Sequence, residues 1–331
     1  MIVVTGGAGF IGSAIVRGLN KRGREDILIV DRLGQDEKWK NLVNLRYHEF
    51  IPADRFIDEI SQGKYARADA KHTKIEAIIH MGAESSTTER DAEYLMKNNY
   101  AYTLALAEYC VQHAPAIRFI YASSAATYGG GEHGYGDDDD TCKKLRPLNI
   151  YGYSKQAVDL HVLARGWDKH MVGLKFFNVF GPNEYHKGDM QSVAYKAWRE
   201  LSQGKEFRLF RSHHPDYADG EQKRDFVWIQ DVVHVVLFFL DNVHARGIYN
   251  VGSGRAAGFN ELLRAVYDAL GREPRIEYTD MPEGLRERYQ YFTKADISKL
   301  RQAGYTAPFT PLAEAVREYV REYLMQGEKK L

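Results

Sequence analysis

The chain has 331 residues, 44% of them hydrophobic, and its 45 basic residues balance 45 acidic ones. This balance of charge argues against nucleic acid or a membrane surface as a partner. No apolar run approaches the ~20 residues that a membrane span needs. The length of the chain predicts two lobes. Because Cys110 and Cys142 lack metal-ligand spacing and the first strand-like run leaves no room for a signal peptide, we expect a cytoplasmic protein without a metal site.

The first predicted element is a strand, Ile2–Thr5, that runs through a glycine-rich turn into a helix. Two glycine spacings fit a dinucleotide fingerprint: Gly7, Gly9 and Gly12, and the variant Gly6, Gly9 and Gly12. Glycine permits a tight turn and close approach of the backbone to a pyrophosphate, which the helix N-terminus attracts. A second strand, Ile27–Asp31, ends in an acid about 20 residues on, as the fingerprint requires. We predict a dinucleotide site rather than an ordinary glycine-rich loop.

Apolar strand-like runs alternate with helical segments over the first half of the chain. The later runs are Ala77–Met81, Arg118–Ser123 and Val172–Phe177. This alternation predicts an α/β fold with a Rossmann-like, doubly wound parallel sheet and a smaller, mixed α/β substrate lobe. We expect residues 1–176, with 225–252 returning to them, to form the dinucleotide-binding domain, and 177–224 with 253–331 to form the lobe. The apolar stripe of the last helix, Leu312–Leu324, indicates packing.

Tyr151 and Lys155 are spaced to share one face of a helix that Asn149 could cap. A tyrosine that acts as acid or base at neutral pH needs its pKa lowered by ~3 units, and an adjacent lysine and a nicotinamide cation are plausible sources. Ser124 follows the strand that ends in Ser123, where a hydroxyl could bond a reacting alcohol or carbonyl. The alternatives are surface packing for the tyrosine–lysine pair and backbone hydrogen bonding for the serines.

Together these elements resemble the extended short-chain dehydrogenase/reductase superfamily. Nearly the whole chain resembles, more closely, the ADP-L-glycero-D-manno-heptose 6-epimerase family. The segments that carry this resemblance are His80–Glu89, Met96–Tyr100, Tyr121–Gly130, Phe177–Pro182, His186–Gly188, Lys223–Val227, Arg288–Gln290 and Phe292-Thr293. The Ser-Ser-Thr-Thr-Glu and His-Lys-Gly stretches within them are far more specific than the glycine and tyrosine motifs.

The resemblance implies one tightly bound NADP per subunit, recycled in each turnover. Asp31 alone would favour NAD, but Arg32 and Lys38 bring two cations toward a 2′-phosphate, unless both are solvated surface charges. The residues implied to contact the cofactor are Gly6, Gly9, Phe10, Ile11, Gly12, Asp31, Arg32, Lys38, Met81, Gly82, Ala83, Glu84, Ser85, Asn98, Tyr151, Lys155 and Val179.

The reaction implied is inversion at C6 of an ADP-heptose, for the heptose of the lipopolysaccharide inner core. An alcohol carbon has no acidic hydrogen, so transient oxidation to a 6-ketone avoids direct deprotonation. Tyr151, Lys155 and Ser124 would assist one half-reaction and Lys187 the other, unless Lys187 anchors a phosphate. The residues implied to bind the sugar nucleotide are Ser85, Asn178, Asp189, Lys196, Phe210, Arg211, Arg224 and Tyr289.

Some residues depart from the family pattern: Ala53, Asp189 and Lys196 replace a lysine, a small hydroxyl residue and a histidine. An extra loop, Gly129–Arg146, carries Asp137 to Asp140, which we interpret as a solvated face and not a metal site. The alternatives are a UDP-sugar 4-epimerase or a 4,6-dehydratase, although dehydratases carry an Asp-Glu pair where Ala125-Ala126 stands here. An NADP-binding redox regulator is a non-enzymatic alternative. The resemblance further implies a homo-oligomer, a pentamer, in a Gram-negative bacterium.

Overall fold

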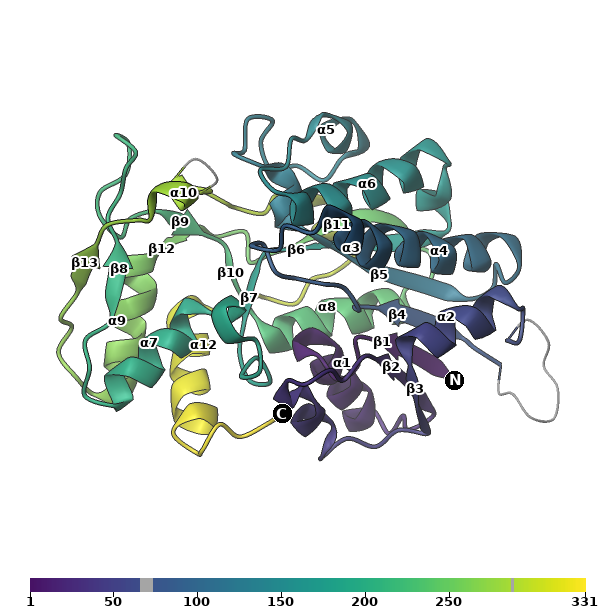
Figure 1. The fold of residues 1–331 in the computed structure, drawn as a ribbon, viewed down its shortest axis with the longest axis horizontal. Helices are drawn as coiled ribbons and strands as arrows, with labels where there is room; N and C mark the ends of the chain where they lie inside the picture. The colour runs from purple at the N-terminus through teal and green to yellow at the C-terminus, as the bar shows by residue number, and fades with distance from the viewer. Residues whose placement is uncertain (66–73, 287–288) are drawn as a thin grey trace.

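The computed structural model describes residues 1–65, 74–286 and 289–331, and a parallel sheet forms the centre of this described part (Figure 1). Its strands are β1 (Ile2–Thr5), β2 (Ile27–Asp31), β3 (Glu49–Pro52), β4 (Ala77–His80), β5 (Arg118–Ser124), β6 (Met171–Phe176) and β11 (Gly247–Val251). They lie in the order β11-β6-β5-β4-β1-β2-β3, and every neighbouring pair is parallel. The predicted fold class is confirmed, and β3 is a sheet strand that the sequence patterns did not predict.

Helices cover both faces of this sheet. Their bounds are α1 (Phe10–Lys21), α2 (Ala53–Ser61), α3 (Ala92–Leu95), α4 (Tyr102–Gln112), α5 (Asp139–Lys144), α6 (Ile150–Ala164) and α8 (Ile229–Asp241). Val4 and Ile29 belong to the core on the side of α1 and α8, whereas Val3 and Leu28 belong to the core beneath α2, α4 and α6. Continuous apolar strands are typical of a parallel sheet buried on both faces.

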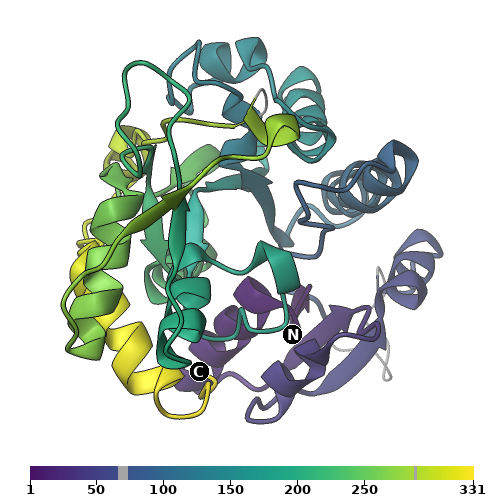
Figure 2. The ribbon, with the colours of Figure 1, turned by 60° about the vertical axis from the view of Figure 1, so that its left-hand side comes forward.

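A second group of elements, mostly C-terminal, gathers at the other end of the molecule from α2 and α4 (Figures 1 and 2). Its helices are α7 (Val193–Ser202), α9 (Phe259–Leu270), α10 (Glu283–Arg286) and α12 (Leu312–Glu318), whereas α11 (Ser298–Gln302) packs against β11 of the sheet. The short strands pair as β7 (Asn178–Phe180) with β10 (Phe226–Trp228), β8 (Arg208–Phe210) with β13 (Glu277–Thr279), and β9 (Lys223–Arg224) with β12 (Ala257–Gly258). The exact domain division stays a prediction, although β11 is hydrogen-bonded to β6.

The strand order reverses beside β1, because β2 lies on one side of it and β4 on the other. In doubly wound sheets, ligands bind outside the carboxyl ends of the strands at such a reversal. The turn from β1 into α1 and the residues after β4 and β5 therefore face one crevice. None of the helices in the described ranges is long and apolar enough to cross a bilayer.

The extra loop Gly129–Arg146 is anchored by one of its acids. Asp138, Asp139 and Asp140 are exposed, and Asp138 caps α5 by accepting a hydrogen bond from the Thr141 amide. Asp137 is only 4% exposed, and its carboxylate accepts a 2.7 Å hydrogen bond from the backbone of Asn250 on β11. The expectation of a solvated acidic face is therefore wrong for Asp137, because the loop folds back onto the sheet edge.

Candidate active site

The turn between β1 and α1 leaves no room for a side chain at Gly6 or Gly12. A Cβ on Gly12 would lie 2.0 Å from the Gly6 carbonyl oxygen, and one on Gly6 would lie 2.7 Å from the amide nitrogen of Gly82. Gly6 also has a φ of 65°, which favours glycine. Within the described ranges no side chain caps the N-terminus of α1, so its first amides remain available to an anion. The turn thus fits a pyrophosphate at the helix N-terminus.

Asp31 lies at the end of β2 and is tied into this turn. One carboxylate oxygen accepts a 2.9 Å hydrogen bond from the Ala8 amide, and the other lies 3.1 Å from Nζ of Lys38. The second oxygen also accepts a 2.7 Å bond from the Arg32 amide. Asp31 is therefore engaged on both oxygens, and Lys38 places a positive charge on the crevice wall beside it.

Tyr151 and Lys155 project from the first turns of α6. The Asn149 side chain accepts a 2.8 Å hydrogen bond from the Gly152 amide, so the predicted cap is confirmed. Lys155 is 3% exposed and donates a 2.9 Å bond from Nζ to the Ala122 carbonyl of β5. Both side chains line the same crevice, as their spacing predicts.

Burial shifts the pKa of each of these two groups against its charged form. It raises the pKa of Tyr151, and a hydrogen bond with Ser124 opposes that rise. It lowers the pKa of Lys155 to about 8, against the opposing negative charge of Asp159. Acid–base work by Tyr151 at neutral pH therefore needs positive charge nearby, from Lys155 and from a cation of the bound ligands.

Ser124 ends β5 and has two roles in this geometry. Its Oγ accepts a 3.1 Å hydrogen bond from the Ala126 amide and so caps the short 3₁₀ helix Ala125–Tyr128, and it also bonds to Tyr151. Ser123 points to the other side of β5 and donates a 2.6 Å bond to Asp159. Of the two serines, Ser124 has its hydroxyl at the tyrosine.

Lys187 enters the crevice from the segment after β7. Its Nζ lies 5.4 Å from the centre of the Phe10 ring, at the start of α1. Burial lowers the pKa of Lys187, and the negative charge of Glu184 opposes this effect. Glu184 is 1% exposed and accepts hydrogen bonds from Gly181, Ser192 and Tyr319. The Lys187 side chain is therefore half-buried and lies on the same crevice wall as Tyr151.

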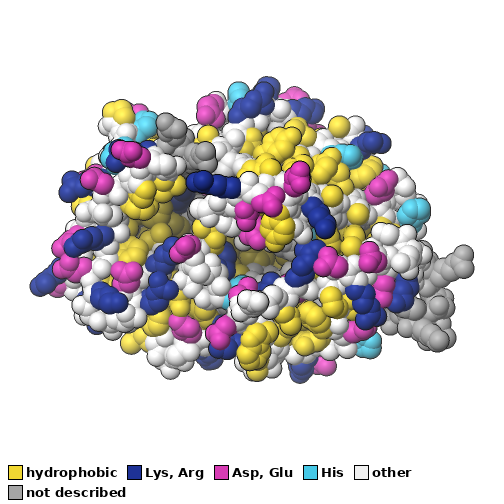
Figure 3. Space-filling model, in the orientation of Figure 1, with side chains coloured by type: hydrophobic (Ala, Val, Ile, Leu, Met, Phe, Trp, Pro, Cys, Tyr) yellow, Lys and Arg dark blue, Asp and Glu magenta, His cyan; other side chains and the backbone are white. Residues whose placement is uncertain are grey.

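The crevice has a volume of about 1010 Å³ and runs from the glycine turn to the C-terminal group of elements. On the face drawn in Figure 3, hydrophobic side chains line a hollow with charged side chains around it. The predicted residues that line the crevice are Gly6, Gly9, Phe10, Ile11, Gly12, Asp31, Lys38, Met81, Gly82, Ala83, Glu84, Ser85, Ser124, Tyr151, Lys155, Asn178, Val179, Lys187, Asp189, Lys196, Phe210, Arg224 and Tyr289.

Three predicted residues do not line the crevice. Arg32 and Asn98 lie together, with a 2.8 Å hydrogen bond between them, and Arg32 also pairs with Asp54. Arg211 is 54% exposed and lies 3.6 Å from Asp219. Arg288, in the last motif of the family resemblance, is outside the described residues. Contact of these side chains with a ligand stays a prediction.

The far end of the crevice carries a stacked arginine. The Arg224 guanidinium lies 4.9 Å from the Tyr289 ring centre and 5.6 Å from that of Phe259, and burial lowers its pKa. Stacking fixes the plane of this cation; one of its nitrogens donates a 2.9 Å bond to the Lys223 carbonyl, and the others are donors suited to a phosphate. At the rim, Nζ of Lys196 donates a 2.8 Å bond to the Asp189 carbonyl, so two departures from the family pattern are in contact.

Sequence reasoning missed several residues of the crevice wall. Examples are His186, Gln222, Phe226 and Phe259. His186 and Phe226 belong to motifs that carry the family resemblance, and this membership could have identified them. Gln222 and Phe259 come together only through the pairing of β9 with β12. No group of three or more His, Cys, Asp or Glu side chains within 1–65, 74–286 and 289–331 could hold a metal ion.

Comparisons with known proteins agree with this architecture. The model of the NAD dependent epimerase/dehydratase family matches residues 2–252. An ADP-L-glycero-D-manno-heptose-6-epimerase of Nitratidesulfovibrio vulgaris is 52% identical over 331 residues, covering 100% of both chains. The crystal structure of the Helicobacter pylori ADP-L-glycero-D-manno-heptose-6-epimerase superposes with a TM-score of 0.80 at 29% identity, over 97% of this chain and 95% of that one.

A more distant enzyme shares the same fold. The Thermus thermophilus UDP-glucose 4-epimerase, solved in complex with NAD, superposes with a TM-score of 0.76 at 27% identity, over 96% of this chain and 97% of that one. The full-length identity to the heptose epimerase is much higher than this value. The chain therefore belongs to the NAD dependent epimerase/dehydratase family and, within it, to the ADP-L-glycero-D-manno-heptose-6-epimerases.

Proposed function

We propose that the chain inverts C6 of an ADP-activated heptose, from the D-glycero to the L-glycero form, through a transient 6-ketone and with recycled NADP. The observation that carries this proposal is the placement of Tyr151 with Ser124 and of Lys187 on the wall of one crevice. Full-length identity to heptose epimerases supports the substrate, and Arg224 stacked on Tyr289 suits its diphosphate.

A bound nicotinamide dinucleotide supplies reversible hydride transfer at the sugar carbon. Tyr151 accepts the proton of the C6 hydroxyl at its phenolic oxygen as the alcohol is oxidised. Ser124 donates a hydrogen bond at that oxygen, and Lys155 contributes positive charge from the same helix face. Lys187 holds the proton that the C6 oxygen takes up when the ketone is reduced from its opposite face.

NADP is the proposed form of the cofactor. Asp31 already accepts from Ala8 and Arg32 and pairs with Lys38, so its charge is partly neutralised. Lys38 on the crevice wall and Arg32, once it turns from Asp54 or bridges to the ligand, are the two cations proposed to bind the 2′-phosphate, and charge-assisted bonds to phosphate are strong. We further propose a homo-oligomer, a pentamer by family resemblance, which light scattering on the purified protein tests.

The test of the reaction compares two substrates. We expect the purified protein to interconvert the two C6 epimers of ADP-glycero-manno-heptose, followed by NMR, and to leave UDP-galactose unchanged. Turnover of UDP-galactose without turnover of the heptose would make the protein a 4-epimerase.

A further inference from the structure

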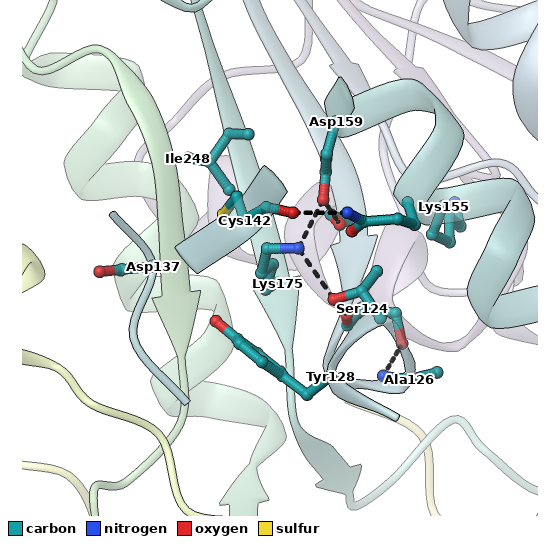
Figure 4. Close-up of polar contacts among 12 residues, drawn as sticks. Ser124, Ala126, Tyr128, Asp137, Cys142, Lys155, Asp159, Lys175 and Ile248 are labelled. Carbon is teal, nitrogen blue, oxygen red and sulfur yellow. Dashed lines mark hydrogen bonds and ion pairs between the residues drawn. The ribbon is translucent and has the colours of Figure 1, made fainter. Parts of the chain in front are cut away.

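Behind the crevice wall lies an ion pair with no exposed surface. Lys175 on β6 and Asp159 on α6 are each 0% exposed, and Nζ of the lysine lies 2.6 Å from the carboxylate (Figure 4). Neither side chain lines the crevice. The pair is therefore built into the interior next to the candidate catalytic residues, and not into the ligand site itself.

The pair is tied to the chain on both sides of Ser124. Lys175 donates a 2.8 Å hydrogen bond to the Thr127 hydroxyl, which donates a 2.8 Å bond to the Ser124 carbonyl. Asp159 accepts a 2.6 Å bond from the hydroxyl of Ser123 and a 2.9 Å bond from that of Tyr121. The segment that presents Ser124 to Tyr151 is thus held through a lysine on one side and a carboxylate on the other.

Asp159 also lies one helical turn after Lys155, on the same face of α6 (Figure 4). The groups that face Lys155 are Asp159 and Tyr151 on its own helix, His80 on β4 and the carbonyl end of β5. His80 is neutral, because burial lowers its pKa to about 3. Asp159 therefore supplies the negative charge that offsets the burial of the Lys155 ammonium.

A gain in folding stability does not by itself explain a buried ion pair. Replacing a buried ion pair by apolar side chains of similar volume is often neutral or stabilising. Here the two charged side chains form hydrogen bonds with Tyr121, Ser123 and Thr127, around Ser124 and Lys155. Apolar side chains could not form these bonds. This connection points to a function in the reaction.

We propose that Asp159 and Lys175 are positioning residues for the epimerase reaction: Lys175, through Thr127, holds Ser124 against Tyr151, and Asp159 keeps Lys155 positively charged. This inference rests on the proposed function for the identity of the reaction. Its central claim concerns Tyr151 and Lys155 and is testable without the sugar.

The experiment uses NADP-loaded protein and the variants Lys175→Met, Asp159→Asn and Thr127→Val. The matched control is Asp231→Asn, which removes a buried charge on α8 that accepts hydrogen bonds only from Thr310 among the described residues and lies outside the crevice wall. Three quantities are measured: kcat and KM against pH, the melting temperature, and the pKa of Tyr151. That pKa comes from ultraviolet difference titration of each variant against the same variant carrying Tyr151→Phe.

We expect Lys175→Met and Thr127→Val to lower kcat about 10- to 100-fold with little change in KM, because a small displacement of a catalytic group is costly. Both should raise the pKa of Tyr151, since Ser124 moves away. Asp159→Asn should lower kcat and move the alkaline limb of its pH profile to lower pH, because Lys155 loses its proton more readily. Asp231→Asn should lower only the melting temperature.

The proposal is overturned if the variants leave the tyrosine titration and the pH profile unchanged and differ from wild type only as Asp231→Asn does. The double variant Asp159→Asn/Lys175→Met leaves no unpaired charge, so it and Thr127→Val decide the question if a single charge removal prevents folding. A wild-type protein inactive on the heptose contradicts the proposed function, whereas the titration arm still tests the positioning of Tyr151.

Discussion

Arg32 makes a two-pronged ion pair with Asp54: one guanidinium nitrogen lies 2.6 Å from one carboxylate oxygen, and another lies 3.2 Å from the second. Asp54 is the second residue of α2. The cation proposed to select NADP is therefore held by a carboxylate of this chain. Its engagement with a 2′-phosphate requires that it turn from Asp54 or bridge the two.

The first prediction concerns this pair and the cofactor. Arg32→Ala should weaken NADP binding at least about 10-fold and leave NAD binding nearly unchanged, because a hydrogen bond to a charged group contributes about 1.5–3 kcal/mol. Fluorescence titration of apoprotein with each dinucleotide measures this. The control Asp54→Asn frees Arg32 and should bind NADP as tightly as wild type or more tightly. Wild-type protein that releases only NAD on denaturation would contradict the assignment.

The second prediction concerns the fate of the hydride. If the sugar is oxidised and reduced at C6 within one site, epimerisation in deuterium oxide should place no solvent deuterium at C6. Mass spectrometry and NMR of the product measure the label. Substantial deuterium at C6 would support a carbanion route and remove the ketone from the mechanism.

The third prediction concerns the two acid–base groups. Tyr151→Phe and Lys187→Met should each lower the epimerisation rate by about 10²–10⁴-fold, the usual size of general acid–base assistance, and leave the circular dichroism spectrum unchanged. With a 7-aldehyde analogue that undergoes dismutation, each single variant should keep partial activity through the surviving group, and the double variant should lose nearly all of it.

Saturation kinetics separate this role of Lys187 from that of a phosphate anchor. A mere anchor predicts a raised KM for Lys187→Met that high substrate concentration overcomes, with kcat little changed. That pattern would remove Lys187 from the catalytic residues and leave Tyr151 working alone.

The fourth prediction concerns pH and the buried Asp137. Burial raises the pKa of this carboxyl from 3.8 to about 6. The folded chain therefore binds more protons than the unfolded chain in this window, and the contribution of Asp137 to stability falls as the pH rises from about 4 to about 6. The full change is about 3 kcal/mol. Asp137→Asn should remove this dependence. The unfolding free energy of the variant minus that of wild type should therefore increase as the pH rises across this window.

Urea unfolding at a series of pH values checks this prediction. Asp138→Asn is the matched control, because Asp138 is exposed and neighbours Asp137 in the same loop. Parallel pH curves for wild type and Asp137→Asn would show that the loop carboxyl is not protonated in the folded state.

Features that depend on neighbours a few residues apart could be predicted from the sequence. The glycine turn after β1, the Asn149 cap and the shared face of Tyr151 and Lys155 all arise from local backbone geometry. The parallel direction of the main strands likewise follows from apolar runs that alternate with helical segments, since each such strand needs cover on both faces.

The partners of charged side chains were decided only by the tertiary structure. Asp54 lies 22 residues from Arg32, Lys175 lies 16 residues from Asp159, and Asn250 lies 113 residues from Asp137. Each contact exists because two particular strands, helices or loops lie side by side, and sequence periodicity does not specify those neighbours. Burial also depends on what covers a side chain, so an acid in a polar run became an interior carboxyl once its loop packed against β11.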